Sequence, residues 1–150
     1  MKSLTQKEFD QMYKNGTKDF SNLGLTCLDF SDLNLENYNF MSSFLRGSNF
    51  TRANLTGAIL KHATLRDADL KYANLTRANL IKASFMGANL KHAILTRSDL
   101  TGAILMGADL NEADLSNCCM NNVDLQDADF KYAILDNVAM FNNYVLIKKG

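Results

Sequence analysis

Large apolar side chains recur at every fifth position along most of this chain. All twenty-five positions from Phe20 to Met140 in steps of five hold Leu, Phe or Met, and seventeen of them hold Leu. Two residues before these centres, fourteen of the twenty-five positions hold Ala, as in Ala53-Asn54-Leu55. The repeating unit is therefore Ala-(Asn/Asp)-Leu followed by two variable residues.

A period of five excludes the two common regular structures. On an α-helix, a step of five turns the side chain by about 140°, so the centres would spiral around every face. On a flat strand, an odd step sends successive centres to opposite faces of the sheet. The pattern predicts a solenoid that turns a corner in each repeat. We expect the Asn or Asp before each centre to suit these bends, because its short side chain hydrogen-bonds neighbouring backbone and tolerates unusual backbone angles.

This register resembles the pentapeptide repeat family over residues 20–140. The resemblance implies an all-β solenoid, namely a right-handed quadrilateral β-helix in which four pentapeptides make one coil and the centre and the residue two before it point inward. Twenty-five repeats then give about six coils, and the spacing of stacked strands gives a rod roughly 30 Å long. Its predicted structural core includes the centres Leu55, Leu75, Leu95 and Leu115.

We expect one domain with three parts. Residues 1–19 form a helical cap and lead-in, residues 20–140 form the β-helix, and residues 141–150 form a tail. Thr5 and Glu8 have the spacing of a capping box, Leu4 and Phe9 that of a hydrophobic staple, and Gly16 ends the helix. The cap is predicted to cover the first coil, since a solenoid must shield its terminal apolar surface.

The tail leaves two alternatives open. It is apolar and rich in residues that favour strands, and the candidate residues for a C-terminal cap or a dimer contact are Phe141, Tyr144, Leu146 and Ile147. Either the tail covers its own last coil, or it meets a second copy in a homodimer, as some family members similarly pair through their carboxyl-terminal coils.

Composition is typical of a globular chain, with 47% apolar and 21% charged residues. No apolar run is long enough to span a membrane, and the amino end lacks the pattern of a secretory signal, so we expect a cytoplasmic protein. The net charge is zero, but residues 41–100 carry nine Lys and Arg against three Asp, while residues 101–140 carry seven acidic residues against Lys131. The rod is therefore predicted to be basic in its middle and acidic towards its end.

Candidate chemistry is sparse. The two histidines, His62 and His92, differ by thirty positions and fall on opposite sides of a four-sided coil, so they cannot share a metal ion. Among the three cysteines, Cys118 is predicted to point inward and Cys119 outward, and all are expected to be reduced. No phosphate-binding loop or hydrolase motif occurs, and a filled interior with a convex surface provides no pocket. We expect no catalytic, cofactor or metal site.

Two outward columns have distinct compositions. One holds a single Asp or Asn in each coil and is predicted to be a solvated hydrogen-bond ladder: Asp29, Asn49, Asp69, Asn89, Asp109 and Asp129. The other holds apolar side chains next to three glycines and is the candidate partner-binding surface: Phe44, Met86, Ile104 and Met106.

Two functions compete on this sequence. The first is a non-enzymatic interaction module or scaffold with an unknown protein partner. The second follows from the resemblance, because the family includes proteins that resemble B-DNA, bind DNA gyrase and protect it from quinolones. Mimicry of DNA requires a long acidic surface, which the basic middle interrupts. Direct nucleic-acid binding is not expected, because the middle lacks interleaved aromatic residues and a helix that could enter a groove.

Overall fold

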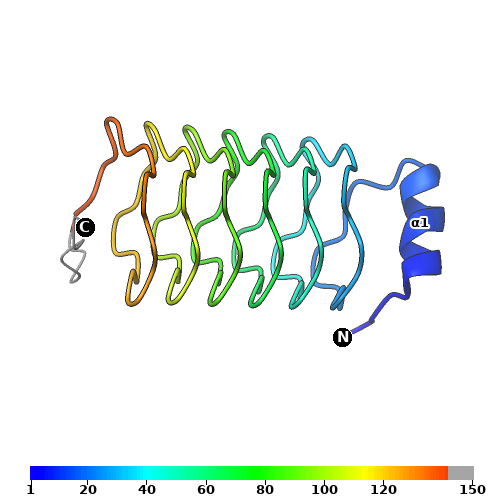
Figure 1. The fold of residues 1–150 in the computed structure, drawn as a ribbon. Coiled ribbons are helices and arrows are strands. Elements are labelled where there is room, and N and C mark those ends of the chain that lie inside the picture. The colour runs from blue at the N-terminus through cyan, green and yellow to red at the C-terminus, as the bar shows by residue number, and fades with distance from the viewer. Residues whose placement is uncertain (142–150) are drawn as a thin grey trace.

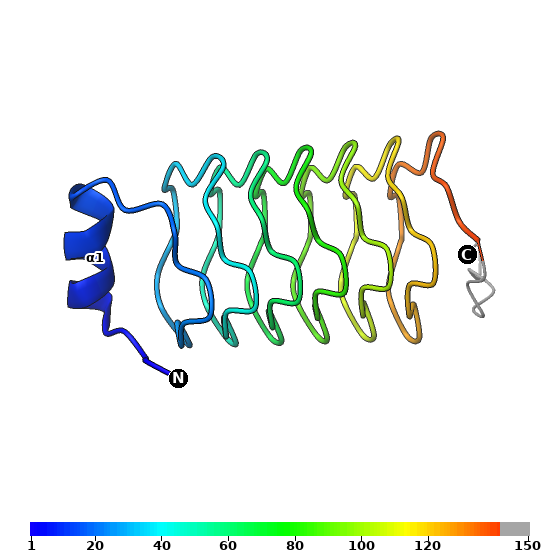
Figure 2. The same cartoon turned by 180° about the vertical axis from the view of Figure 1, so that it is seen from behind.

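The structure is a computed structural model that describes residues 1–141 of the 150-residue chain. Its body is a stack of single-residue parallel β-bridges, each joining residues twenty positions apart, as in Asp29 with Asn49. One row of bridges runs from Asp19 to Ala139 in six steps of twenty, so six coils of four pentapeptides are stacked along one axis. Figures 1 and 2 show this four-sided β-helix with the single helix at its amino end. The predicted fold is confirmed.

Every backbone amide of a typical pentapeptide has an acceptor. In the pentapeptide from Leu70 to Asn74, the five amides donate at 2.7–3.0 Å, in order, to the Asn89 carbonyl, the Asp69 side chain, and the Lys91, Leu70 and Ala53 carbonyls. Three of these bonds join neighbouring coils, one closes a turn, and one goes to the Asp side chain. The fold therefore satisfies its backbone donors without long strands.

The bends lie later in the repeat than the sequence suggested. The second residue after each centre from Phe20 to Leu135 has a φ of about 55–68°, and nineteen of these residues are not glycine. The Asn or Asp before the centre is extended instead, and at all fifteen such positions its side-chain oxygen accepts the amide two residues on. The prediction was right about the side-chain hydrogen bond and wrong about the unusual backbone angles.

The interior is filled by the repeat centres and the small residues before them. Leu55, Leu75, Leu95 and Leu115 are all 0% exposed. The first coils carry larger residues, and their rings stack along the axis, with Phe30 and Phe50 at 4.6 Å between ring centroids. Side chains therefore occupy the axis of the rod from one coil to the next.

The helix α1, Gln6–Lys14, covers the first coil. Thr5 is its N-cap, with the Glu8 amide donating to the Thr5 hydroxyl and the Thr5 amide donating to the Glu8 carboxylate, so the predicted capping box is present. Phe9 is fully buried and meets the rings of Phe20 and Phe30 at centroid distances of 4.9 and 4.7 Å. Gly16 follows the C-cap with a φ of 80°, as predicted for the end of this helix.

The opposite end of the rod is less well covered. The inward side chains of the last three pentapeptides, residues 126–140, are half-buried: Ala128, Phe130, Ala133, Leu135, Val138 and Met140. Phe141 is 67% exposed, and the other candidate tail residues, Tyr144, Leu146 and Ile147, lie outside the described residues. Within residues 1–141, no helix combines the length and hydrophobicity needed to cross a membrane.

Candidate functional site

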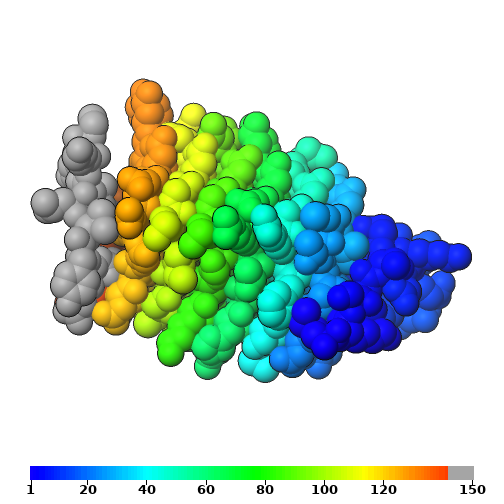
Figure 3. All heavy atoms as spheres, turned by 90° about the horizontal axis from the view of Figure 1, so that it is seen from below, coloured from blue at the N-terminus to red at the C-terminus, as the bar shows by residue number. Residues whose placement is uncertain are grey.

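Three residues of each pentapeptide face outward: the bridge residue and the two residues of the turn. The bridge residues form four flat faces, each named here after one member. They are the Phe44 face (positions 24, 44, 64, 84, 104, 124), the Asp29 face (29, 49, 69, 89, 109, 129), the Ile94 face (34, 54, 74, 94, 114, 134) and the Ile59 face (19, 39, 59, 79, 99, 119, 139). The turns between them form four corners. Figure 3 shows the coils as adjoining bands along the rod.

The predicted partner-binding residues lie on the Phe44 face and its neighbouring corner. Met86 and Met106 occupy the same turn position in successive coils, and Ile104 lies beside them on the face. All three are half-buried, whereas Phe44 is 47% exposed and lies three coils away in its ladder, beyond Thr64 and Ser84. The structure thus groups Met86, Ile104 and Met106 and leaves Phe44 apart from them.

The Asp29 face carries two pairs of the six-residue ladder expected from the sequence. The Asn49 amide donates to Asp29 at 3.0 Å, and the Asn89 amide donates to Asp69 at 3.1 Å. Hydrogen bonds from the Ser31 hydroxyl and amide lower the pKa of Asp29. At Asp109, burial raises the pKa, but the hydrogen bonds from Asn111 and Lys91 outweigh it and leave a lowered pKa. The Asp29 and Asp109 carboxylates are therefore hydrogen-bond acceptors rather than proton donors at neutral pH.

The corner between the Asp29 and Ile94 faces holds a column that the sequence analysis missed. Arg52 binds Asp32 through two hydrogen bonds of 2.6 and 2.7 Å. Further along, the rings of Tyr72 and His92 stack at 4.8 Å with an angle of 8° between their planes, and His92 Nδ1 lies 3.4 Å from Glu112. The available signal was the twenty-residue spacing of these positions, which places them one above another.

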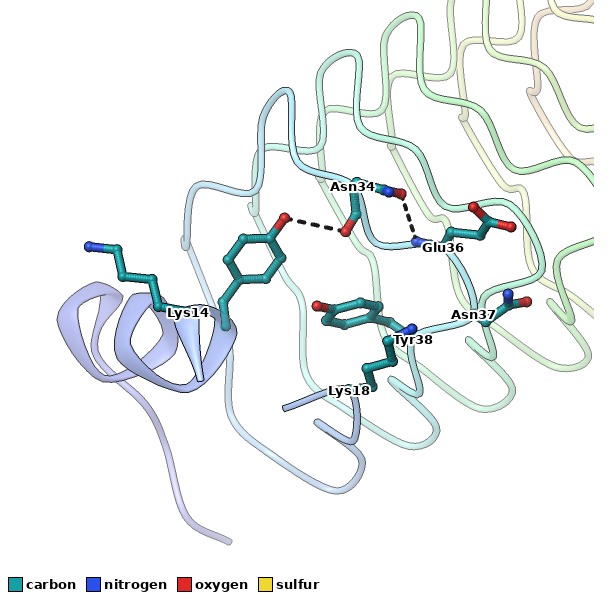
Figure 4. A pocket seen from close by; sticks show the side chains of 7 residues that line it. Lys14, Lys18, Asn34, Glu36, Asn37 and Tyr38 are labelled. Atoms are coloured by element: carbon teal, nitrogen blue, oxygen red, sulfur yellow. Dashed lines mark hydrogen bonds between the residues drawn. The ribbon is translucent and has the colours of Figure 1, made fainter. Parts of the chain in front are cut away.

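A groove of about 590 Å³ lies between the C-terminal end of α1 and the first coil (Figure 4). The Tyr13 hydroxyl donates to the Asn34 carbonyl at 3.4 Å, and the Lys18 ammonium lies 5.8 Å from the centre of the Tyr38 ring. Burial, and to a smaller extent Tyr13, raises the pKa of Tyr38, so its hydroxyl is protonated at neutral pH and is not a base. The residues that line the groove include no Ser, Cys or His that could form a pair of nucleophile and base.

The cysteines and histidines do not form a metal-binding cluster within the described residues. Cys118 is buried, its thiol donates to the Leu95 carbonyl at 2.8 Å, and burial raises its pKa. Cys119 is exposed, as predicted from its outward position. In the part of the chain that the structure describes, no three His, Cys, Asp or Glu side chains are placed to hold a metal ion.

Comparison with known proteins identifies the family to which the repeats belong. A family model described as pentapeptide repeats matches residues 48–85, 83–122 and 108–142 in eight copies, which together cover more than half of the chain. No curated protein sequence matches the chain.

Several solved structures are similar, and three of them illustrate the range. Rfr23, a pentapeptide repeat protein from the cyanobacterium Cyanothece 51142, is 21% identical with a TM-score of 0.64, over 89% of this chain and 99% of that chain. A trypsin-treated form of QnrB1, a plasmid-mediated fluoroquinolone resistance protein, is 24% identical with a TM-score of 0.63, over 83% of this chain and 65% of that chain. A pentapeptide repeat protein from the thylakoid lumen of Arabidopsis thaliana is 37% identical with a TM-score of 0.50, over 67% and 66%.

Proposed function

We propose that this chain, which belongs to the pentapeptide repeat family, is a non-enzymatic protein-protein interaction module. One observation carries the proposal: side chains fill the axis of the rod, so its chemical groups are displayed on flat faces and corners. Backbone bonds between coils fix the spacing of these groups, and a partner can therefore bind them at a low entropic cost. A surface of flat faces and outward corners suits the binding of another macromolecule better than the binding of a small substrate.

The first test concerns the group formed by Met86, Ile104 and Met106. Wild-type protein and the variant Met106→Glu are immobilised and used to capture proteins from an extract of the source cells. Ser116→Glu is the matched control, because Ser116 occupies the same turn position at the opposite corner. A protein that is retained by the wild type and the control but lost with Met106→Glu, at an unchanged thermal midpoint, supports this surface. A capture profile that is identical for all three proteins would exclude it.

The alternative proposal is a DNA-mimicking binder of DNA gyrase, and the net charge of −6 on residues 101–140 favours it. The net charge of +6 on residues 41–100 opposes it, since duplex DNA carries one negative charge per about 1.7 Å of its axis. A supercoiling assay separates the two functions. Inhibition of gyrase at micromolar protein would favour mimicry, whereas unchanged supercoiling would exclude it.

Two further proposals concern assembly and location. If the tail covers its own last coil, light scattering will give a mass of 16.7 kDa, and if two copies meet there, it will give twice that mass. Cytoplasmic location stays a prediction, and the Arabidopsis relative is a protein of the thylakoid lumen.

A further inference from the structure

The cations of the basic middle divide into two groups by their contacts. Ion pairs engage Arg46 and Arg66 with Asp67, Arg52 with Asp32, and Lys91 with Asp109, while Lys71 lies over the ring of Tyr72. The other four cations of residues 41–100 have no ion pair, side-chain hydrogen bond or ring contact within residues 1–141: Lys61, Arg77, Lys82 and Arg97.

These four side chains border one face of the rod. Arg77 and Arg97 occupy the same position of successive turns at the corner between the Ile94 and Ile59 faces. Lys61 and Lys82 belong to turns at the corner on the other side of the Ile59 face. Lys61 is half-buried, and the other three are exposed.

The strip of the Ile59 face between these two corners can accept a chain of mixed character. Ile59 is 38% exposed, and Asn79 is the next bridge residue in the ladder. The single acidic residue of this strip is Asp99, whose Oδ1 already accepts the Thr101 amide at 3.0 Å and the Thr101 hydroxyl at 2.6 Å. The strip therefore has one row of unpaired cations along each of its two edges, and the exposed side chain of Ile59 lies between the two rows.

The stacking of Arg77 and Arg97 does not stabilise the rod. Adjacent coils lie about 4.8 Å apart, so Arg77 and Arg97 are stacked like charges, which destabilise a ladder. Two other columns also stack like charges, Arg46 with Arg66 and Lys71 with Lys91, but there Asp67, Asp109 and the ring of Tyr72 contact the cations. Arg77 and Arg97 have no such neighbour within residues 1–141. An unneutralised pair of arginines is better explained by a ligand, because the guanidinium fork binds carboxylates in a bidentate manner.

We propose that the Ile59 face, with Lys61, Arg77, Lys82 and Arg97 at its two corners, is a docking site for an extended acidic segment of a partner protein. This inference rests on the proposed interaction function and names the chemistry of the partner. Carboxylates of the segment pair with the two rows of cations, and an apolar side chain between them contacts Ile59. Nucleic acid fits less well, because residues 76–82 and 96–102 contain no Phe, Tyr or Trp on which bases could stack.

Fluorescence anisotropy of a labelled peptide with the repeating sequence Glu-Ile-Glu-Gly tests the site on the full chain. The double variant R77A/R97A is expected to weaken binding by about tenfold or more. The double variant R46A/R66A is the matched control, because it removes two arginines at the opposite corner and changes the net charge equally. It is expected to change binding by less than about twofold. Circular dichroism and thermal midpoints verify that both variants fold.

Four other outcomes would each contradict the proposed docking site. Equal loss in both double variants would show that only net charge matters. Binding of a labelled single-stranded DNA but not of the peptide would replace a protein partner with nucleic acid. A dimer that dissociates in R77A/R97A would make a second copy the occupant. An absence of peptide binding would remove this site, whereas the proposed interaction function would still be decided by the capture experiment with Met106→Glu.

Discussion

At the scale of single residues, the repeat leaves little freedom for backbone donors. Each amide of a pentapeptide such as Leu70 to Asn74 has its own acceptor, so proline at any of the five positions would remove a hydrogen bond. The chain contains no proline. The turn residue with positive φ is held in place by bonds to the next coil on its own amide and to the centre on the following amide. This explains why nineteen residues other than glycine adopt a left-handed conformation.

Gly107→Ala isolates the cost of this conformation. Gly107 has a φ of 64°, and a Cβ added there would meet no atom within 4 Å, so only the backbone angle opposes the substitution. We expect a loss of about 1 kcal/mol in the free energy of unfolding, measured in urea. Gly107→Asn is the control and should lose less, because asparagine tolerates this conformation and adopts it at Asn117 and Asn122. Equal losses would show that the angle itself is not limiting.

The lowered pKa of Asp29 predicts that the stability of the protein depends on pH. The pKa of this carboxyl is lowered in the folded state, chiefly by the Ser31 hydroxyl and amide. A lowered pKa contributes stability that is complete above the unfolded value of about 3.9 and is lost as the pH falls through the folded value. Asp29→Asn keeps an acceptor oxygen but cannot titrate, so its urea midpoint should fall less between pH 7 and about pH 3 than that of the wild type. Identical acid sensitivity of the two proteins would contradict this role.

The sequence predicted the inward positions better than the outward ones. The centres from Phe20 onward follow from a period that needs no knowledge of the fold. The left-handed position was missed, although Gly47, Gly57, Gly87, Gly102 and Gly107 all occupy it. The free cations could not be identified either, because the pairing of Arg46 with Asp67 depends on how side chains reach between neighbouring coils.

At the scale of elements, α1 is stabilised by its cap and by the coil beneath it. Thr5→Ala removes the hydroxyl that accepts the Glu8 amide and should cost about 0.5–2 kcal/mol of stability in urea unfolding. Thr5→Ser retains the hydroxyl and should restore most of the loss. If serine destabilised the protein as much as alanine, the methyl group of Thr5 rather than the capping box would be responsible.

A single coil depends on its buried centres. Leu75 is 0% exposed, and Leu75→Ala should cost about 2–5 kcal/mol because it leaves a cavity on the axis of the rod. Ile94→Ala removes an apolar side chain of similar size from an outward position that is 42% exposed, and it should cost less than about 1 kcal/mol. Chemical denaturation of both variants tests the register. A neutral effect of Leu75→Ala would contradict the inward assignment of the centres.

At the scale of the whole molecule, the two ends of the rod differ. The first coil is covered by Phe9 and α1, whereas the inward residues of positions 126–140 are half-buried. In a stack in which each coil contacts only its neighbours, opening begins at the less covered end. Amide hydrogen exchange should therefore be slowest in residues 60–119 and faster in residues 121–139. Uniform protection along the rod would indicate that it unfolds as one cooperative unit.

The same stack separates charge along its axis. Residues 41–100 and 101–140 carry net charges of +6 and −6, so a neutral chain becomes an electric dipole once it is coiled. Ion pairs within and between coils neutralise part of this charge at two corners, and the four cations of residues 41–100 with no ion pair, side-chain hydrogen bond or ring contact within residues 1–141 lie beside the Ile59 face. Binding through that face should weaken at high salt, since exposed charges are screened over about 10 Å at 0.1 M ionic strength.

The twenty-residue spacing of the bridges also limits how the length of the rod can change during evolution. Insertion or deletion of four pentapeptides adds or removes one complete coil, and every later residue keeps its face. Insertion of a single pentapeptide preserves the core but turns all later residues by a quarter of a revolution. A pentapeptide inserted between Arg77 and Arg97 would place the two arginines at different corners. The pattern of buried side chains would stay the same. Binding surfaces on this rod can therefore be lost or created by short duplications that leave the interior intact.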